Sequence, residues 1–212
     1  MDRPDRPGAQ QWVPAHGGIE QLRAAAGSCR GCELWQPATQ VVFSSGPPDA
    51  AVVMVGEQPG DAEDTSGEPF VGPAGRLLRR AIGAAGLPEQ DIYLTNAVKH
   101  FRFTERGRRR LHQRPDLAHM VACRPWLDAE LAEVPAQVVV LLGAVAARSV
   151  LGPGVKVTEE RGRVLRRATP VGDRPVLLTV HPSAVLRARG EAHTAAYDAL
   201  VTDLRTVAAA LG

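Results

Sequence analysis

An arginine-rich segment of the chain, residues 102–114, contains a single histidine, His112. Arginine binds phosphate through planar, bidentate hydrogen bonds, so the segment can hold a nucleic-acid backbone. A neutral imidazole there can act as a nucleophile toward a molecule that is already bound. Arg108, Arg109 and Arg110 are therefore predicted to bind DNA, and His112 is predicted to react. The alternative is a solvated charged loop, which is what most charge runs are.

Three cysteines and one histidine form a second group with chemical potential. Cys29 and Cys32 are separated by two residues, and Cys123 follows much later in the chain. Without a secretory signal, a disulfide framework is not expected. His100 is the candidate fourth ligand of a metal site. The spacing leaves zinc, an iron–sulfur cluster, a redox pair and plain buried cysteines open.

Length and composition indicate one compact domain. The 212 residues are 44% hydrophobic, which is enough for a sizeable core. Residues 1–18 are rich in Pro, Gly, Gln and Arg and lack an apolar stretch, so a disordered leader is expected before a single domain at 19–212. A cytoplasmic protein is the default expectation. The net charge of +2 is too small to indicate DNA binding by itself.

Apolar segments alternate with amphipathic ones along the chain. Buried strands are predicted at 51–55, 91–97, 137–142 and 176–180, with a candidate minor strand at 164–167. Helices are predicted at 73–85, 116–134, 144–151 and 191–211, with a kink or break at Pro125. This alternation predicts an α/β fold, a three-layer α/β/α sandwich with a central, mainly parallel four-stranded sheet.

Polar residues follow the predicted strands where each strand ends. Because the carboxyl ends of parallel strands meet at one edge of the sheet, these residues should gather there. Each alone has a structural explanation, since Asn96 could satisfy a turn and His181 could be a capped core histidine. Their convergence favours a site. The residues concerned are Glu57, Gln58, Asp61, Asn96 and His181.

These segments together resemble the uracil-DNA glycosylase superfamily, close to its family 4 members with an iron–sulfur cluster. The resemblance covers roughly residues 29–204. Its motifs are specific when taken together, whereas any one of them alone would be weak. The motifs are Gly56–Gly60 followed by Glu63–Asp64, Pro69–Gly75 with Phe70, Thr95–Lys99, Ala122–Pro125 and His181–Ser183.

Two departures from family 4 point to its UdgX branch. His100 stands where those glycosylases have a cysteine, and an arginine-rich insertion ending in His112 follows. The UdgX branch excises uracil and stays attached to the DNA through a loop histidine. Its loop reads Lys-Arg-Arg-Ile-His, whereas residues 108–112 here read Arg-Arg-Arg-Leu-His. The substitutions keep the charge and the apolar spacer.

The resemblance implies a role for each site residue. Phe70 would stack on a flipped-out uracil, unless it is ordinary core, and Asn96 would select uracil by its imide edge. His181 would donate to the departing base, and His112 would attack the sugar with Glu57 taking its proton. The remaining assignments are Gln58 and Asp61 at the sugar side, Gly56 and Ser183 in substrate binding, and Arg187 on DNA.

The resemblance also implies an iron–sulfur cluster of the 4Fe-4S type, held by Cys29, Cys32, His100 and Cys123 in a structural role. The expected partner is uracil-containing DNA, single-stranded or with a flipped-out base, and the expected state is a monomer. Two alternatives remain, a multiple-turnover glycosylase whose loop only clamps DNA and a noncatalytic metal-stabilised nucleic-acid binder. His112 with Glu57 discriminates among them, because a clamp needs arginines but no imidazole.

Overall fold

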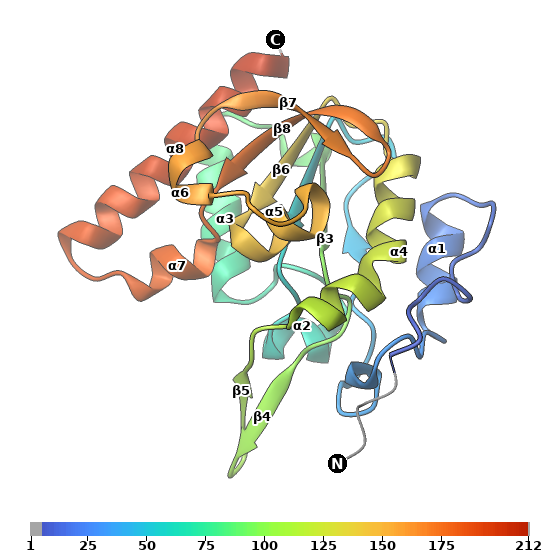
Figure 1. The fold of residues 1–212 in the computed structure, drawn as a ribbon. Helices are drawn as coiled ribbons and strands as arrows, with labels where there is room; N and C mark the ends of the chain where they lie inside the picture. The colour runs from blue at the N-terminus through green and yellow to red at the C-terminus, as the bar shows by residue number, and fades with distance from the viewer. Residues whose placement is uncertain (1–5, 212) are drawn as a thin grey trace.

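A six-stranded sheet forms the centre of the molecule in the computed structural model, which describes residues 6–211. Its strand order is β1-β3-β2-β6-β8-β7, with β3, β2, β6 and β8 parallel and the two edge strands antiparallel (Figure 1). The strands are β1 (Ser44–Ser45), β2 (Val52–Gly56), β3 (Ile92–Asn96), β6 (Val138–Leu142), β7 (Val164–Thr169) and β8 (Gly172–Thr179).

Helices cover both faces of the sheet, which confirms the three-layer α/β/α prediction. Alternate residues of β2 enter different cores, Val53 and Val55 on one face and Val52 and Met54 on the other. The first core contains α1 (Ile19–Ala26), α4 (Leu117–Glu133) and α5 (Gly143–Leu151); the second contains α3 (Pro73–Ala84), α7 (Pro182–Arg187) and α8 (Glu191–Leu211). The shorter helices are α2 (Asp61–Ser66), α6 (Val157–Glu160), η1 (Glu33–Trp35) and η2 (Glu89–Asp91).

The predicted number of strands was wrong. The four predicted main strands are the parallel strands β2, β3, β6 and β8, and the candidate minor strand is β7. The sheet gains its other edge from β1, a two-residue strand that is too short to show a hydrophobic pattern. Parallel strands buried on both faces give continuous apolar runs, whereas edge strands do not.

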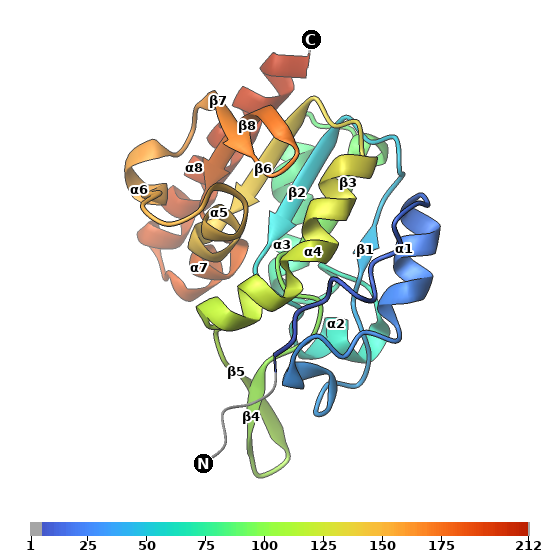
Figure 2. The same cartoon turned by 45° about the vertical axis from the view of Figure 1, so that its right-hand side comes forward.

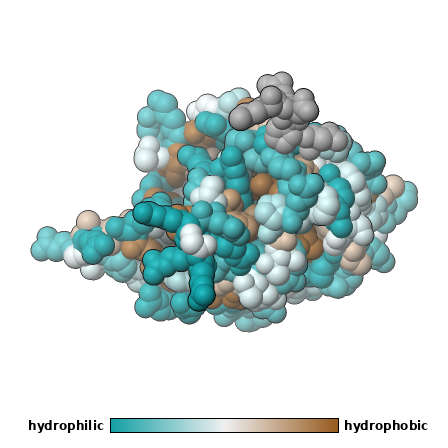
Figure 3. Space-filling view, turned by 90° about the horizontal axis from the view of Figure 1, so that it is seen from below, coloured by the Kyte–Doolittle hydropathy of each residue, from teal (hydrophilic) through white to brown (hydrophobic). Residues whose placement is uncertain are grey.

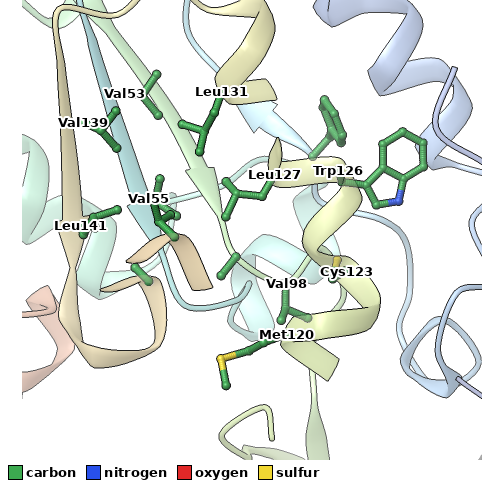
Figure 4. Packing of buried hydrophobic residues seen from close by; sticks show 14 of the residues in the cluster. Val53, Val55, Val98, Met120, Cys123, Trp126, Leu127, Leu131, Val139 and Leu141 are labelled. Atoms are coloured by element: carbon green, nitrogen blue, oxygen red, sulfur yellow. The ribbon is translucent and has the colours of Figure 1, made fainter. Parts of the chain in front are cut away.

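Helix α4 continues through Pro125 without the break that was one of the two expected outcomes, and it bends along its length (Figure 2). The carbonyl that would lose its partner to the proline belongs to Val121, which is exposed, so water can solvate it. Trp126 and Leu127 follow directly and are fully buried. Leu127 points toward the sheet, whereas Trp126 points away from it and donates to Cys29 Sγ (Figure 4). Packing on two sides therefore holds the helix in place across the proline.

The N-terminal segment differs from the expected disordered leader. The backbone N–H of Gly8 donates to Gly31, and that of Ala9 donates to Ala122. Ala9 is fully buried, and Arg6 forms ion pairs with Glu33 and Asp116. Residues 6–18 thus lie against the domain, while residues 1–5 are outside the described part of the chain. Composition did not reveal this backbone pairing.

The arginine-rich segment is a β-hairpin. Strands β4 (Phe103–Arg106) and β5 (Arg109–His112) pair in antiparallel register, with Gly107 at φ +61° in the turn. The hairpin extends from the end of the molecule where the parallel strands terminate (Figures 1 and 2). Among the described residues, no helix is long and apolar enough to cross a membrane.

Candidate active site

A pocket of about 1000 Å³ lies at the carboxyl ends of the parallel strands. Its walls come from the segments that follow β2, β3, β6 and β8, as predicted from the strand ends, and from the hairpin. Figure 3 views this end of the molecule, whose surface is mostly hydrophilic with smaller apolar areas between. The lining includes Glu57, Gln58, Asp61, Phe70, Asn96, His112, His181, Ser183 and Arg187.

Asn96 and Phe70 meet at Gly56, the last residue of β2. A Cβ at Gly56 would lie 2.3 Å from Asn96 Oδ1 and 2.6 Å from Phe70 Cζ, so only glycine allows this approach. Phe70 is 5% exposed and has φ 59°, a left-handed conformation that costs about 1–3 kcal/mol for a non-glycine residue. Such a strained aromatic residue at a pocket wall marks a functional constraint.

Glu63 holds this strained loop, a role that the sequence did not reveal. Its two carboxylate oxygens accept hydrogen bonds from the backbone of Gly60 (3.1 Å) and Gly72 (2.9 Å). One carboxylate thus ties the loop after β2 to the loop that carries Phe70. A glutamate in the first turn of α2, three residues after Gly60, is the signal that could have identified it.

His181 is prepared to donate a hydrogen bond into the pocket. Its Nδ1 accepts from the backbone N–H of Ser183 (3.2 Å) and lies 2.9 Å from Ser183 Oγ. The proton of a neutral ring must then be on Nε2. Burial lowers the pKa of His181 to about 4, with further lowering by the charges of His112 and Arg187. His181 is therefore a neutral donor at physiological pH.

His112 and Glu57 face each other across the pocket, with His112 Nε2 3.5 Å from Glu57 Oε1. Burial lowers the pKa of His112, and the charge of Arg187 lowers it further. Burial raises the pKa of Glu57, against the opposing effect of Arg114 and Arg187. The lowered pKa of His112 and the raised pKa of Glu57 both disfavour an imidazolium–carboxylate ion pair. The arrangement is a neutral imidazole, with a free lone pair, beside a potential proton acceptor.

Gln58 lines the pocket, and its side-chain amide is also bonded to the hairpin. Its Nε2 donates to the carbonyls of Arg102 (3.2 Å) and Gln113 (3.0 Å), and its Oε1 accepts from the Arg102 N–H (3.2 Å). Arg102 and Gln113 flank the two strands of the hairpin. The Gln58 amide therefore holds the base of the hairpin that carries His112.

Arg110 is also occupied, although it was expected to bind DNA with its neighbours. It forms ion pairs with Asp61 and Asp64, each at 2.5 Å, and donates to Thr39 Oγ1 (3.1 Å). Asp64 is fully buried. Arg110 therefore fastens the hairpin to α2 and engages Asp61, whereas Arg108 and Arg109 are exposed.

The three cysteines and His100 line one small cavity between the N-terminal segment and α4. Cys29 Sγ accepts from the Gly31 backbone (3.4 Å) and from Trp126 Nε1 (3.3 Å). Burial lowers the pKa of His100 to about 4, so its ring is neutral and able to act as a ligand. Among residues 6–211, no group of three or more His, Cys, Asp or Glu side chains is arranged to hold a single metal ion.

The chain matches the model of the uracil DNA glycosylase superfamily over residues 43–205. The chain belongs to this superfamily. It is 35% identical to the type-4 uracil-DNA glycosylase of Thermotoga maritima over 162 residues, which cover 76% of the chain and 79% of that relative. It is 32% identical to the type-4 uracil-DNA glycosylase of Sulfurisphaera tokodaii over 173 residues, covering 79% and 76%.

The superfamily match contains every pocket residue described above, together with the hairpin. Cys29 and Cys32 lie before it, so this evidence for the family does not depend on them. One network of buried polar side chains inside the matched region was not predicted from the sequence. Lys99 and Glu130 form a buried ion pair behind Asn96. Glu130 lies in α4 outside every recognised motif, and no sequence pattern pointed to it.

Proposed function

We propose that this member of the superfamily excises uracil from DNA and becomes covalently linked to the resulting sugar through His112. One observation carries the proposal. The hairpin places a neutral imidazole, with a carboxylate 3.5 Å away, in the same pocket as Asn96, Phe70 and His181. A hairpin that only clamped DNA would need its arginines but not this pair.

The base enters the pocket outside the helical stack, at an unstacking cost of a few kcal/mol. Phe70 stacks on it, a contact worth about 1–3 kcal/mol in single-strand binders. The buried Asn96 amide accepts from the imide N–H of uracil and donates to the neighbouring carbonyl. Cytosine presents the reversed pattern and is rejected because buried polar groups would stay unpaired.

Cleavage of the glycosidic bond sends its electron pair to the base, which leaves as an anion. A donor aimed at the carbonyl of that base stabilises the transition state, and such donors are worth roughly 3–4 kcal/mol in oxyanion holes. The Nε2–H of neutral His181 supplies this donor, because Ser183 occupies Nδ1. The sugar is left electron-deficient at its anomeric carbon.

The unprotonated ring nitrogen of His112 then bonds to the anomeric carbon, and the ring passes its proton to the Glu57 carboxylate. The product is a neutral N-alkylimidazole. It lacks the good leaving group of an acyl or glycosyl-ester intermediate, so the protein reacts once. Gln58 and the Arg110–Asp61 pair act through the hairpin, by holding His112 at the pocket.

Arg108, Arg109 and Arg187 bind the phosphates of uracil-containing DNA in this proposal. All three are exposed, and Arg187 also lines the pocket, where its Nη1 donates to Ser183 Oγ (3.2 Å). Phosphate contacts add affinity without sequence information. Arg110 is omitted from this set because two carboxylates already engage its guanidinium.

A 4Fe-4S cluster is proposed on Cys29, Cys32, His100 and Cys123. The donor set fits, since thiolates and one neutral imidazole are known iron–sulfur ligands, and N–H groups point at the sulfurs. The four side chains line one small cavity, although they come from segments far apart in the sequence. The cluster would tie separate segments together.

A denaturing gel tests the proposed function. The protein is incubated with single-stranded DNA containing one uracil, and a shifted band that resists heat and SDS is expected in stoichiometric amounts. His112→Ala should lose the band. Abasic DNA in excess over protein would instead indicate a multiple-turnover glycosylase, and unchanged DNA would indicate a noncatalytic binder.

A further inference from the structure

A buried ion pair lies directly behind the residue that selects the base. Lys99 is 1% exposed and Glu130 is 0% exposed, and neither side chain lines the pocket. Burying two charges costs desolvation free energy that an apolar pair of the same shape would avoid. The presence of a buried ion pair at this position therefore indicates that the backbone beside it must be held in a specific geometry.

The Lys99 ammonium uses all three of its donors. It donates to Thr95 Oγ1 (2.6 Å), to the backbone carbonyl of Asn96 (3.0 Å) and to the carboxylate of Glu130. Asn96 is the last residue of β3, and the next N–H, that of Ala97, bonds to Gly56 (3.0 Å). The backbone around Asn96 is thus held from β2 on one side and by Lys99 on the other.

Lys99 also contacts the helix that carries a cysteine of the proposed cluster. Its backbone N–H donates to Cys123 Sγ (3.3 Å), while its ammonium pairs with Glu130. Cys123 and Glu130 both belong to α4 and are about two helical turns apart, so they lie on one face. Lys99 therefore joins α4 to the end of β3 at two points.

We infer that Lys99 is a positioning residue, which sets the Asn96 amide against the uracil by holding the Asn96 carbonyl and the face of α4. The inference rests on the proposed function. Lys99 reaches neither the DNA-binding arginines nor the substrate, so its loss should slow the chemical step and leave the DNA affinity unchanged. A displacement of about 1 Å at a reacting group can cost on the order of 100-fold in rate.

Three variants of the full-length protein test this inference. Lys99→Met removes the ammonium and leaves the Glu130 carboxylate buried without its partner. The double variant Lys99→Met/Glu130→Gln also removes that charge, so it should fold more readily. Tyr93→Phe is the matched control, because Tyr93 donates to Glu130 Oε1 (2.9 Å) in the same network and does not contact Asn96. Iron content and thermal midpoint are recorded for each variant. Uracil release and crosslinking are measured as rates against the concentration of uracil-containing single-stranded DNA.

The expected result is a fall of roughly 10- to 100-fold in the saturating rate for both Lys99 variants, with an unchanged half-saturating DNA concentration. Tyr93→Phe should keep the parent rate. The inference is overturned if the folded double variant reacts at the parent rate, or if Tyr93→Phe loses as much rate as Lys99→Met. A parent that releases uracil without crosslinking would contradict only the covalent step, because release rates still compare the variants.

Discussion

The two histidines of the pocket have different partners and therefore different acid–base behaviour. Ser183 fixes the proton of His181 on Nε2, whereas His112 faces the Glu57 carboxylate. Burial lowers the pKa of both rings and raises that of Glu57. Each residue type was foreseeable from its motif. The direction of each pKa shift was not, because burial and the nearby Arg187 depend on the folded pocket.

The pH dependence of crosslinking follows from these directions. Both rings are neutral at pH values where an ordinary histidine, with a pKa of about 6.5, is already protonated. Protonation of either Glu57 or His112 removes a reacting group, and burial raises the pKa of Glu57 while it lowers that of His112. The crosslinking rate is expected to be level at neutral pH and to fall with acidity. Rapid-quench gels at saturating DNA measure it.

Glu57→Gln is the control for that profile. The variant should react more slowly at neutral pH, since no carboxylate accepts the proton, and its acid limb should then report only the protonation of the histidines. An acid limb that stays in place in Glu57→Gln would assign it to another group.

Gly56→Ala should abolish uracil release while leaving the protein folded. The added Cβ would meet Asn96 Oδ1 at 2.3 Å and Phe70 Cζ at 2.6 Å, so the base-binding side chains must move apart. A loss of at least about 100-fold in rate is expected. The matched control is Gly83→Ala in α3, where a Cβ meets nothing within 4 Å and helix propensity predicts a gain of about 1 kcal/mol. Normal release by Gly56→Ala would contradict the proposed base site.

At the scale of elements, the hairpin shows what a charge run can and cannot reveal. Its sequence predicted a cationic loop with one reactive histidine, and the structure places that histidine at the pocket. The sequence could not distinguish Arg110 from Arg108 and Arg109. The carboxylates that engage Arg110 belong to Asp61 and Asp64, more than forty residues earlier, and meet it only after folding.

The arginines should therefore separate into two classes. Arg108→Ala and Arg109→Ala remove exposed charges, so each should weaken DNA binding and reduce the salt slope by about 1. With three such contacts, counting Arg187, the parent should lose roughly 40-fold in affinity between 50 and 200 mM salt. Arg110→Ala should instead slow crosslinking with little change in that slope, because it releases the hairpin from α2. Fluorescence anisotropy and gel assays measure the two effects.

An equal salt slope in Arg108→Ala and the parent would show that the exposed arginines do not bind phosphate. A reduced slope in Arg110→Ala, equal to that of Arg108→Ala, would contradict its assignment as an anchor.

At the scale of the whole molecule, the parallel core was predictable and its periphery was not. Long apolar runs identify β2, β3, β6 and β8 because both faces of these strands are buried. The N-terminal segment lacks such a run, yet Ala9 is fully buried and Arg6 pairs with Glu33 and Asp116. These contacts join segments that are far apart in the sequence, so they cannot be predicted from local composition.

Loss of the proposed cluster should therefore destabilise the whole domain. Its ligands come from the N-terminal segment, from the chain after β3 and from α4, three regions that are far apart in the sequence. A bound group present at about 1,000 times its dissociation constant stabilises the fold by about 4 kcal/mol. In a chain of this size, that free energy corresponds to roughly 8–16 °C in the thermal midpoint. Removing iron with a chelator under oxidising conditions should lower the thermal midpoint by that order, as measured by calorimetry. The same treatment should not change the midpoint of Cys123→Ser, which begins without a complete ligand set. An unchanged midpoint after iron loss from the parent would show that packing alone holds these segments together.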